Sequence, residues 1–228
     1  MHDKRGSRPI LKRDAMTPPK HCTIFRDRID AAGRLGQRLQ AYRGKNPLVL
    51  AIPRGAVPMA KCIAQALQGE FDVVLVRKLG APFEPEFAIG SVDENGWTYL
   101  SPHAAPAEAD PHYIAEEKHR QLQVIRQRRT QYTPIRPPLD VTGRIVIVVD
   151  DGLATGATML AALHSLRQRH PARLICAVPV ASQEALDMVR PLADELLCLQ
   201  APADFQAVGQ FYRDFAQVED DEVIALLK

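Results

Sequence analysis

Residues 146–158 constrain the fold of this chain more than any other segment. They begin with four consecutive β-branched residues, which are typical of a strand buried on both faces of a parallel sheet. Two adjacent carboxylates follow, then a loop of small residues, then apolar residues at helical spacing at positions 159, 163 and 166. This order of strand, acidic pair, small loop and helix predicts a phosphate site at the carboxyl edge of an α/β sheet.

The residue types in this segment fit two parts of one ligand. Gly156 lets the backbone approach a phosphate and can adopt positive φ. The N–H groups and the dipole of a helix start favour an anion, and Thr155 and Thr158 add hydroxyl donors. Asp150 and Asp151 would repel that phosphate, so they are better placed to accept hydrogen bonds from a vicinal diol or to hold Mg²⁺ through water. A ribose 5-phosphate satisfies both halves of the segment.

The same residues resemble the phosphoribosyl pyrophosphate (PRPP) binding signature of the type I phosphoribosyltransferases. That signature is an apolar strand, two acids and a short loop containing Thr and Gly. The resemblance implies catalytic and Mg²⁺-binding roles for Asp150 and Asp151. It also implies that the 5-phosphate is bound by the loop residues Ala154, Thr155, Gly156, Ala157 and Thr158. Gly152 departs from the family, whose members usually carry an aliphatic residue there.

Two other interpretations of residues 146–158 compete with this one. A buried strand with exposed acids and an ordinary helix cap would need no ligand, but it leaves the adjacent acid pair unexplained. A Walker-type nucleotide loop requires Gly-Lys-Ser or Gly-Lys-Thr, which does not follow the strand here.

A second unit of strand, turn and helix lies earlier in the chain. Residues 48–52 predict a buried strand and residues 57–67 an apolar helix, with Pro53, Arg54 and Gly55 in the turn between them. This unit resembles the pyrophosphate loop of the same family. The resemblance implies that the turn binds pyrophosphate, that Arg54 adds charge and assists catalysis, and that a non-proline cis peptide occurs there. Taken alone, the unit fits a plain βα turn with a surface arginine; the first motif favours function.

Residues 71–79 predict another buried strand, with Arg77 and Lys78 at its end. Side chains alternate between the faces of a strand, so at most one of these cations is expected to reach the ligand directly. Lys78 is the candidate, in a catalytic role. The alternative is a solvated strand end.

Residues 80–110 change character because prolines punctuate them. Inside this stretch, Asn95 and Gly96 separate two strand-like runs and predict a hairpin. The insertion resembles the mobile hood loop of phosphoribosyltransferases, so the hairpin is the candidate for a moving lid. The helix expected over residues 110–131 carries a basic surface, which in most proteins is simply solvated.

The alternation of strands and helices predicts one doubly wound α/β domain over residues 23–228, with a mainly parallel sheet and a small hood. Residues 201–228 are expected to close the domain and to end in a short helix. Within them, Phe205 is the candidate on which a flat acceptor base stacks, whereas Phe211 and Phe215 are expected to seal the sheet. Residues 1–22 predict a flexible basic tail.

Composition narrows the possible classes. The net charge of +2 gives no overall reason to expect a nucleic-acid partner. No apolar run approaches the roughly 20 residues of a membrane helix, and the N-terminus lacks an apolar signal core, so a cytoplasmic location is expected. The four cysteines form no Cys-x-x-Cys pair and are expected to be reduced thiols.

The resemblance as a whole implies Mg²⁺-dependent transfer of ribose 5-phosphate from PRPP to a nitrogen acceptor such as a nucleobase, with release of pyrophosphate. It also implies a homodimer. The alternative is a non-catalytic PRPP-binding regulator, because a fold and a ligand site do not establish catalysis. Such a regulator would bind PRPP without releasing pyrophosphate.

Overall fold

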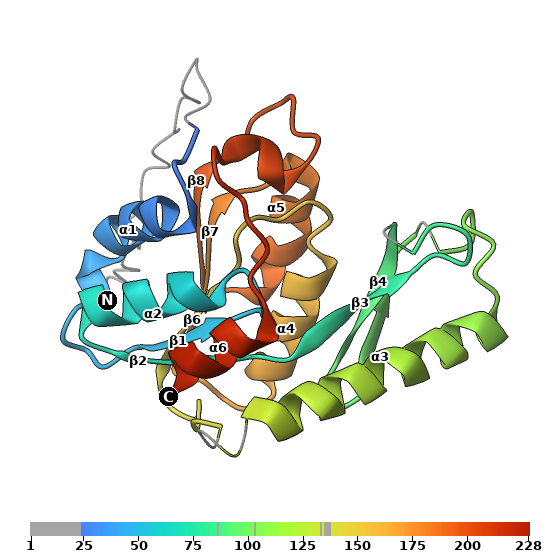
Figure 1. The fold of residues 1–228 in the computed structure, drawn as a ribbon, viewed down its shortest axis with the longest axis horizontal. Coiled ribbons are helices and arrows are strands. Elements are labelled where there is room, and N and C mark those ends of the chain that lie inside the picture. The colour runs from blue at the N-terminus through green and yellow to red at the C-terminus, as the bar shows by residue number, and fades with distance from the viewer. Residues whose placement is uncertain (1–23, 86, 103, 133, 135–137) are drawn as a thin grey trace, which may run out of the picture.

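The computed structural model describes residues 24–228, apart from 86, 103, 133 and 135–137. The predicted basic tail over residues 1–22 lies outside the described residues. The chain forms a five-stranded parallel sheet with helices on both faces, and a smaller antiparallel sheet with one long helix beside it (Figure 1). This architecture confirms the doubly wound α/β fold that the sequence predicts.

The strands of the main sheet run in the order β2-β1-β6-β7-β8. Their bounds are β1 Leu48–Ala51, β2 Glu70–Val73, β6 Ile145–Val149, β7 Arg173–Val180 and β8 Glu195–Gln200. In the register of β1, Ala51 pairs with Val73 on one side and with Val149 on the other. The segments that follow β1 and β6 therefore leave the sheet side by side at its carboxyl edge.

Side-chain alternation along β6 assigns helices to the two faces of the sheet. Ile147 and Val149 pack in a core with α1 and α2, whereas Val146 and Val148 pack in a second core with α4 and α5. Asp27 caps α1 by accepting a hydrogen bond from the Asp30 N–H at 2.8 Å. The helices of the core are α1 Arg28–Arg38, α2 Val57–Leu67, α4 Ala157–Arg167, α5 Gln183–Val189 and α6 Asp220–Leu227, with short 3-10 turns η1 Gln40–Tyr42, η2 Arg190–Leu192 and η3 Val208–Phe211.

Residues 76–132 form the lobe that we call the hood. It contains β3 Val76–Gly80, β4 Ala88–Asp93, β5 Thr98–Leu100 and α3 Pro111–Tyr132. The sequence predicted a single strand over residues 71–79, and this was wrong: β2 ends at Val73, and β3 leaves the main sheet to pair antiparallel with β4. The apolar run through this point carries no Gly or Pro to mark the break. The hood, residues 76–132, therefore begins before and ends after the insertion that the sequence predicted over residues 80–110.

The β4–β5 hairpin turn lies at the base of the hood, against the core. Gly96 has φ +85°, as the predicted Asn-Gly turn requires. The Trp97 ring stacks on His164 of α4 with centroids 3.7 Å apart, and Glu94 accepts two hydrogen bonds of 2.7 Å from Arg129. These contacts hold the turn against α4 and α3 in this structure, and the moving lid stays a prediction.

The C-terminal helix α6 packs against α2 of the core and α3 of the hood, and Figure 1 shows it between them. Among the described residues, no helix is both long enough and apolar enough to cross a membrane.

Candidate functional site

The predicted phosphate loop lies between β6 and α4 and is held by the neighbouring β7–α5 connection. The Leu153 N–H donates to the Val180 carbonyl at 3.0 Å, and the Ser182 hydroxyl donates to the Ala154 carbonyl at 2.7 Å. Gly156 caps α4 with φ +75°, the left-handed conformation that its sequence position predicts. The first turn of α4 leaves backbone N–H groups without helical partners, so the loop can receive an anion.

Two of the loop residues that the sequence proposes as phosphate ligands are open to solvent. Ala154 and Thr155 are exposed, and Thr158 is half-buried. Gly156 has a packing role as well: a β-carbon there would lie 3.2 Å from both Cβ and the carbonyl oxygen of Ala185 on α5. Replacing Gly156 would therefore disturb the contact between α4 and α5 together with any phosphate.

The acid pair stands at the carboxyl end of β6. An oxygen of Asp150 accepts a hydrogen bond from the Asp151 N–H at 2.9 Å, and Oδ2 of Asp151 accepts one from Nε of Arg28 at 2.9 Å. Burial raises the pKa of the Asp150 carboxyl well above its usual range, and the negative charge of Asp151 raises it further. Burial also raises the pKa of Asp151, while Arg28 opposes that rise. A pair with these properties favours an added cation.

The turn after β1 packs directly against the acid pair. The Pro53–Arg54 peptide bond is cis, as the family resemblance implies for this turn. A β-carbon on Gly55 would lie only 2.2 Å from Oδ2 of Asp151 and 3.0 Å from Nε of Arg28. The two motifs, about a hundred residues apart in the sequence, thus meet in one site.

Arg77 and Lys78 point to opposite sides of β3, as strand alternation predicts. Nε of Arg77 donates to Gln121 of α3 at 2.9 Å. Lys78 pairs in register with Ser91, whose hydroxyl donates to the Ala157 carbonyl at 2.7 Å. Because directly paired residues share a face of the sheet, Lys78 is on the side that faces the start of α4.

The C-terminal segment completes the surroundings of the acid pair. The Tyr212 hydroxyl donates to the Asp151 carbonyl at 2.6 Å. The Arg28 guanidinium lies over the Phe215 ring, 3.9 Å from its centroid, and Phe215 stacks on Tyr212. A β-carbon on Gly152 would lie 2.6 Å from Val208, so the glycine that departs from the family pattern makes room for this segment.

Sequence reasoning missed the contacts that Arg28, Tyr212 and Phe215 make around Asp151, and it expected Phe215 to seal the sheet. No local pattern marks these residues, because they reach Asp151 from α1 and from the C-terminal segment. Phe205, the predicted stacking residue, is half-buried and stacks on the buried Phe211 with centroids 5.4 Å apart. That contact ties one side of its ring to the core.

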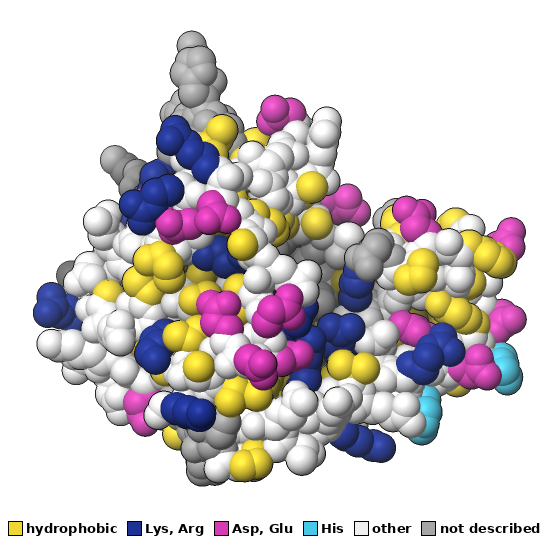
Figure 2. Space-filling model, viewed as in Figure 1, with side chains coloured by type: hydrophobic (Ala, Val, Ile, Leu, Met, Phe, Trp, Pro, Cys, Tyr) yellow, Lys and Arg dark blue, Asp and Glu magenta, His cyan; other side chains and the backbone are white. Residues whose placement is uncertain are grey.

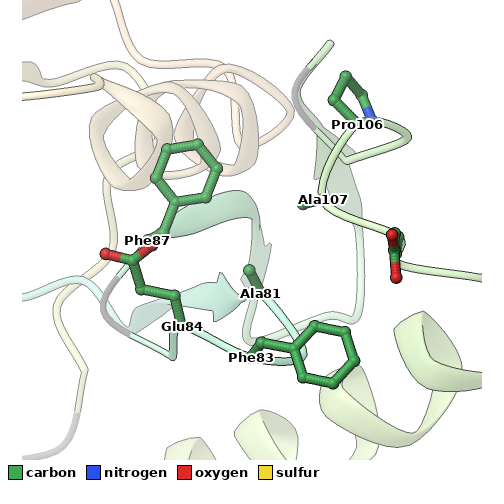
Figure 3. Close-up of a pocket in the computed structure, with 7 residues that line it drawn as sticks. Ala81, Phe83, Glu84, Phe87, Pro106 and Ala107 are labelled. Carbon is green, nitrogen blue, oxygen red and sulfur yellow. The ribbon is translucent and has the colours of Figure 1, made fainter.

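A separate cavity of about 420 Å³ lies between the loops at the free end of the hood (Figure 3). Phe83, Glu84 and Phe87 line one side, and the segment around Pro106 and Ala107 lines the other. None of its lining residues belongs to either motif. Phe83 is 85% exposed.

The model of the phosphoribosyl transferase domain matches residues 26–216. The chain belongs to this family. It is 46% identical to TT1426 from Thermus thermophilus, whose crystal structure superposes with a TM-score of 0.75 and a coverage of 90% of this chain and 98% of that one.

Two curated relatives from Mycobacterium tuberculosis are 41% identical over 205 residues. They are "Putative phosphoribosyl transferase MT0597" from strain CDC 1551 and "Putative phosphoribosyl transferase Rv0571c" from strain H37Rv. The match covers 90% of this chain and 46% of each relative, so the chain spans about half the length of these proteins.

Proposed function

We propose that this phosphoribosyl transferase family member transfers ribose 5-phosphate from PRPP to a nitrogen acceptor such as a nucleobase and releases pyrophosphate. The observation that carries the proposal is the close approach of Gly55 to Asp151. It joins the cis-peptide turn, the acid pair and the loop that begins three residues later. A ligand with a phosphate at one end and a pyrophosphate at the other fits this arrangement.

Each part of the site has a role in that proposal. The loop Ala154–Thr158 binds the 5-phosphate, and Asp150 and Asp151 accept hydrogen bonds from the ribose diol. The turn of Pro53, Arg54 and Gly55 binds pyrophosphate, and Lys78 adds positive charge from the hood. Holding both ends of PRPP fixes the anomeric carbon between them, which supplies part of the rate enhancement through positioning.

The reaction replaces one bond at the anomeric carbon by another. The carbon–oxygen bond to pyrophosphate breaks and its electron pair leaves with pyrophosphate. A lone pair on the acceptor nitrogen forms the new bond, and the N–H proton of the acceptor is released. Cations at the pyrophosphate stabilise the charge that develops on it.

The donor set at the end of β6 fits Mg²⁺, which prefers carboxylate and water oxygens. The raised pKa values of Asp150 and Asp151 reflect burial of two negative charges that a cation would offset. Within the described ranges, no group of three or more His, Cys, Asp or Glu side chains is placed to hold a metal. We therefore propose that the acid pair holds Mg²⁺ partly through water and the ligand, and that the ion supplies positive charge to the leaving pyrophosphate.

Phe205 is proposed as the residue on which the acceptor base stacks, and Phe215 is the alternative candidate for this role. Phe205 follows the last sheet strand at the carboxyl edge, and one face of its ring is taken by Phe211. Phe215 is more exposed and lies beside Arg28, which holds Asp151. A homodimer is a further proposal that rests on the family resemblance, and a cytoplasmic location stays a prediction from the sequence.

The test is pyrophosphate release from PRPP and Mg²⁺ across a panel of purine and pyrimidine bases, with the full chain. Release that depends on one base supports the transferase. Saturable PRPP binding with no release for any base would support the alternative, a PRPP-binding regulator.

A further inference from the structure

Three arginines from different elements converge where the core meets the hood. Arg54 comes from the turn after β1, Arg77 from β3 and Arg128 from α3. Their side chains are largely covered: Arg54 is 24% and Arg128 14% exposed, and Arg77 is half-buried. Figure 2 shows basic side chains gathered beside acidic ones over the region of α6, next to the hood.

One carboxylate at the start of α6 bridges two of these arginines. Asp220 has one oxygen 3.7 Å from Arg54 and the other 3.6 Å from Arg128. The latter oxygen also accepts a hydrogen bond of 2.9 Å from the Tyr132 hydroxyl. Glu219 accepts a bond of 2.8 Å from Arg54. Asp220 therefore links the core to the hood as a counter-ion.

Arg77 belongs to the same cluster. Its Nε donates to Gln121, which precedes Arg128 by two helical turns and so shares its face of α3. Burial lowers the pKa of the Arg77 guanidinium, and the charges of Arg128 and Arg54 lower it further. Glu117 and Asp220 oppose this effect, but Glu117 is already bonded to Arg120.

The cluster holds more positive charge than its carboxylates neutralise. One of its acids, Glu219, pairs with Arg54 but not with Arg77 or Arg128. The Glu219 side chain is also 62% exposed, so solvent screens its charge. A ligand that carries several negative charges and many acceptor oxygens would satisfy three guanidinium groups better than one carboxylate does. The pyrophosphate turn supplies Arg54, so the cluster adjoins the proposed pyrophosphate end of the site.

We propose that Arg54, Arg77 and Arg128 form the site for the pyrophosphate group of PRPP, and that Asp220 is an internal counter-ion which pyrophosphate replaces. The inference rests on the proposed function and adds to it. The hood helix α3 supplies a binding residue, Arg128, and the start of α6 competes with the ligand. Binding of pyrophosphate then releases Asp220 from its link between core and hood.

The chain offers a matched control for each variant. Arg129 neighbours Arg128 on α3 but is bound to Glu94. Asp221 neighbours Asp220 in the first turn of α6 and is exposed. The experiment measures binding of inorganic pyrophosphate and, separately, of ribose 5-phosphate to the full chain by calorimetry at low ionic strength. Melting temperatures are recorded for every variant.

Arg128→Gln should weaken pyrophosphate binding by about tenfold or more, which is the loss expected for one charge-assisted contact. It should leave ribose 5-phosphate binding unchanged, and Arg129→Gln should change neither. Asp220→Asn should tighten pyrophosphate binding several-fold, whereas Asp221→Asn should not. Asn keeps an oxygen that can accept from Tyr132, so this variant should remain folded.

Equal losses of pyrophosphate affinity in Arg128→Gln and Arg129→Gln would overturn the proposal. They would show that pyrophosphate responds only to the overall positive charge of α3. Unchanged or weaker pyrophosphate binding in Asp220→Asn would overturn it too, and this arm decides the question if Arg128→Gln does not fold. If the wild type binds ribose 5-phosphate and Arg128→Gln still binds pyrophosphate as tightly as the wild type does, the three-arginine site is refuted. The proposed function is not refuted by that result. Binding of neither ligand by the wild type would contradict the proposed function as well.

Discussion

Gly55 and Asp151 approach so closely that a β-carbon on the glycine would lie 2.2 Å from the aspartate carboxylate. Real β-carbons essentially never lie that close to another heavy atom. Asp151 also accepts from Arg28, so it cannot move aside without breaking an ion pair of 2.9 Å. The glycine is thus required by the chemistry of the neighbouring strand end.

Gly55→Ala is expected to displace the Asp151 carboxylate and to weaken PRPP binding by about tenfold or more. The added methyl group should also cost about 1–3 kcal/mol of folding free energy, as overpacking does. Calorimetric titration and thermal melting measure the two effects. Gly33→Ala is the control, because among the described residues no heavy atom beyond its chain neighbours and the surrounding backbone of α1 lies within 4 Å of its β-carbon position. This variant should bind PRPP normally. Normal PRPP binding by Gly55→Ala would show that this packing is not needed.

Asp150→Asn is expected to stabilise the ligand-free chain at neutral pH while it weakens PRPP binding. The folded-state pKa of Asp150 is raised above its ordinary 3.8, so stability falls as pH rises through the raised pKa and the carboxylate ionises. Asn removes that loss. The gain in melting temperature should therefore be larger at pH 8 than near pH 4, where the acid is protonated in the folded state. A gain of the same size at both pH values would refute this electrostatic origin.

Thr158→Val should weaken binding of ribose 5-phosphate by about tenfold, because a hydroxyl donor to a charged oxygen is lost while the side-chain shape is kept. The Thr158 side chain is a better test than Gly156, whose replacement would also strike α5. Thr130→Val, on the exposed face of α3, is the control and should bind normally. If the wild type, Thr158→Val and Thr130→Val bind ribose 5-phosphate equally well, the Thr158 hydroxyl does not contribute to the phosphate site.

Phe205→Ala and Phe215→Ala separate the two candidates for stacking the acceptor. Truncation of the residue that stacks on the base should raise the Michaelis constant for the acceptor far more than the Michaelis constant for PRPP. Phe83→Ala, at the exposed tip of the hood, should change neither constant. If Phe205→Ala lowers the melting temperature and leaves both Michaelis constants unchanged, Phe205 belongs to the core. Phe215 is then the remaining candidate for stacking on the acceptor base.

The parts of the site that sequence predicted are those in which neighbouring residues act together. Residues 146–158 combine a strand, an acid pair, a loop and a helix start, and each has a local physical signature. Arg28 and Tyr212 have none, because they lie 123 and 61 residues from Asp151 in the chain. Only the packing of α1 and of the C-terminal segment on the sheet brings them there.

The break between β2 and β3 was missed for a different reason. Four apolar residues, 73–76, run through it without interruption, and periodicity cannot divide a uniform run. Both sides of the break are buried, but in different sheets. The same error hid the true extent of the hood, and with it the position of Arg77 beside α3.

We propose that the acid pair, the cis-peptide turn and the loop before α4 form one PRPP site. The most direct measurement is calorimetric titration of PRPP with Mg²⁺ into the wild-type chain and into the double variant Asp150→Asn, Asp151→Asn, with melting temperatures as the check on folding. We expect one PRPP to bind per chain and the folded double variant to bind about 100-fold more weakly, since two charge-assisted contacts are lost. Equal affinity of the two proteins for PRPP, or no PRPP binding by the wild type, would refute this site.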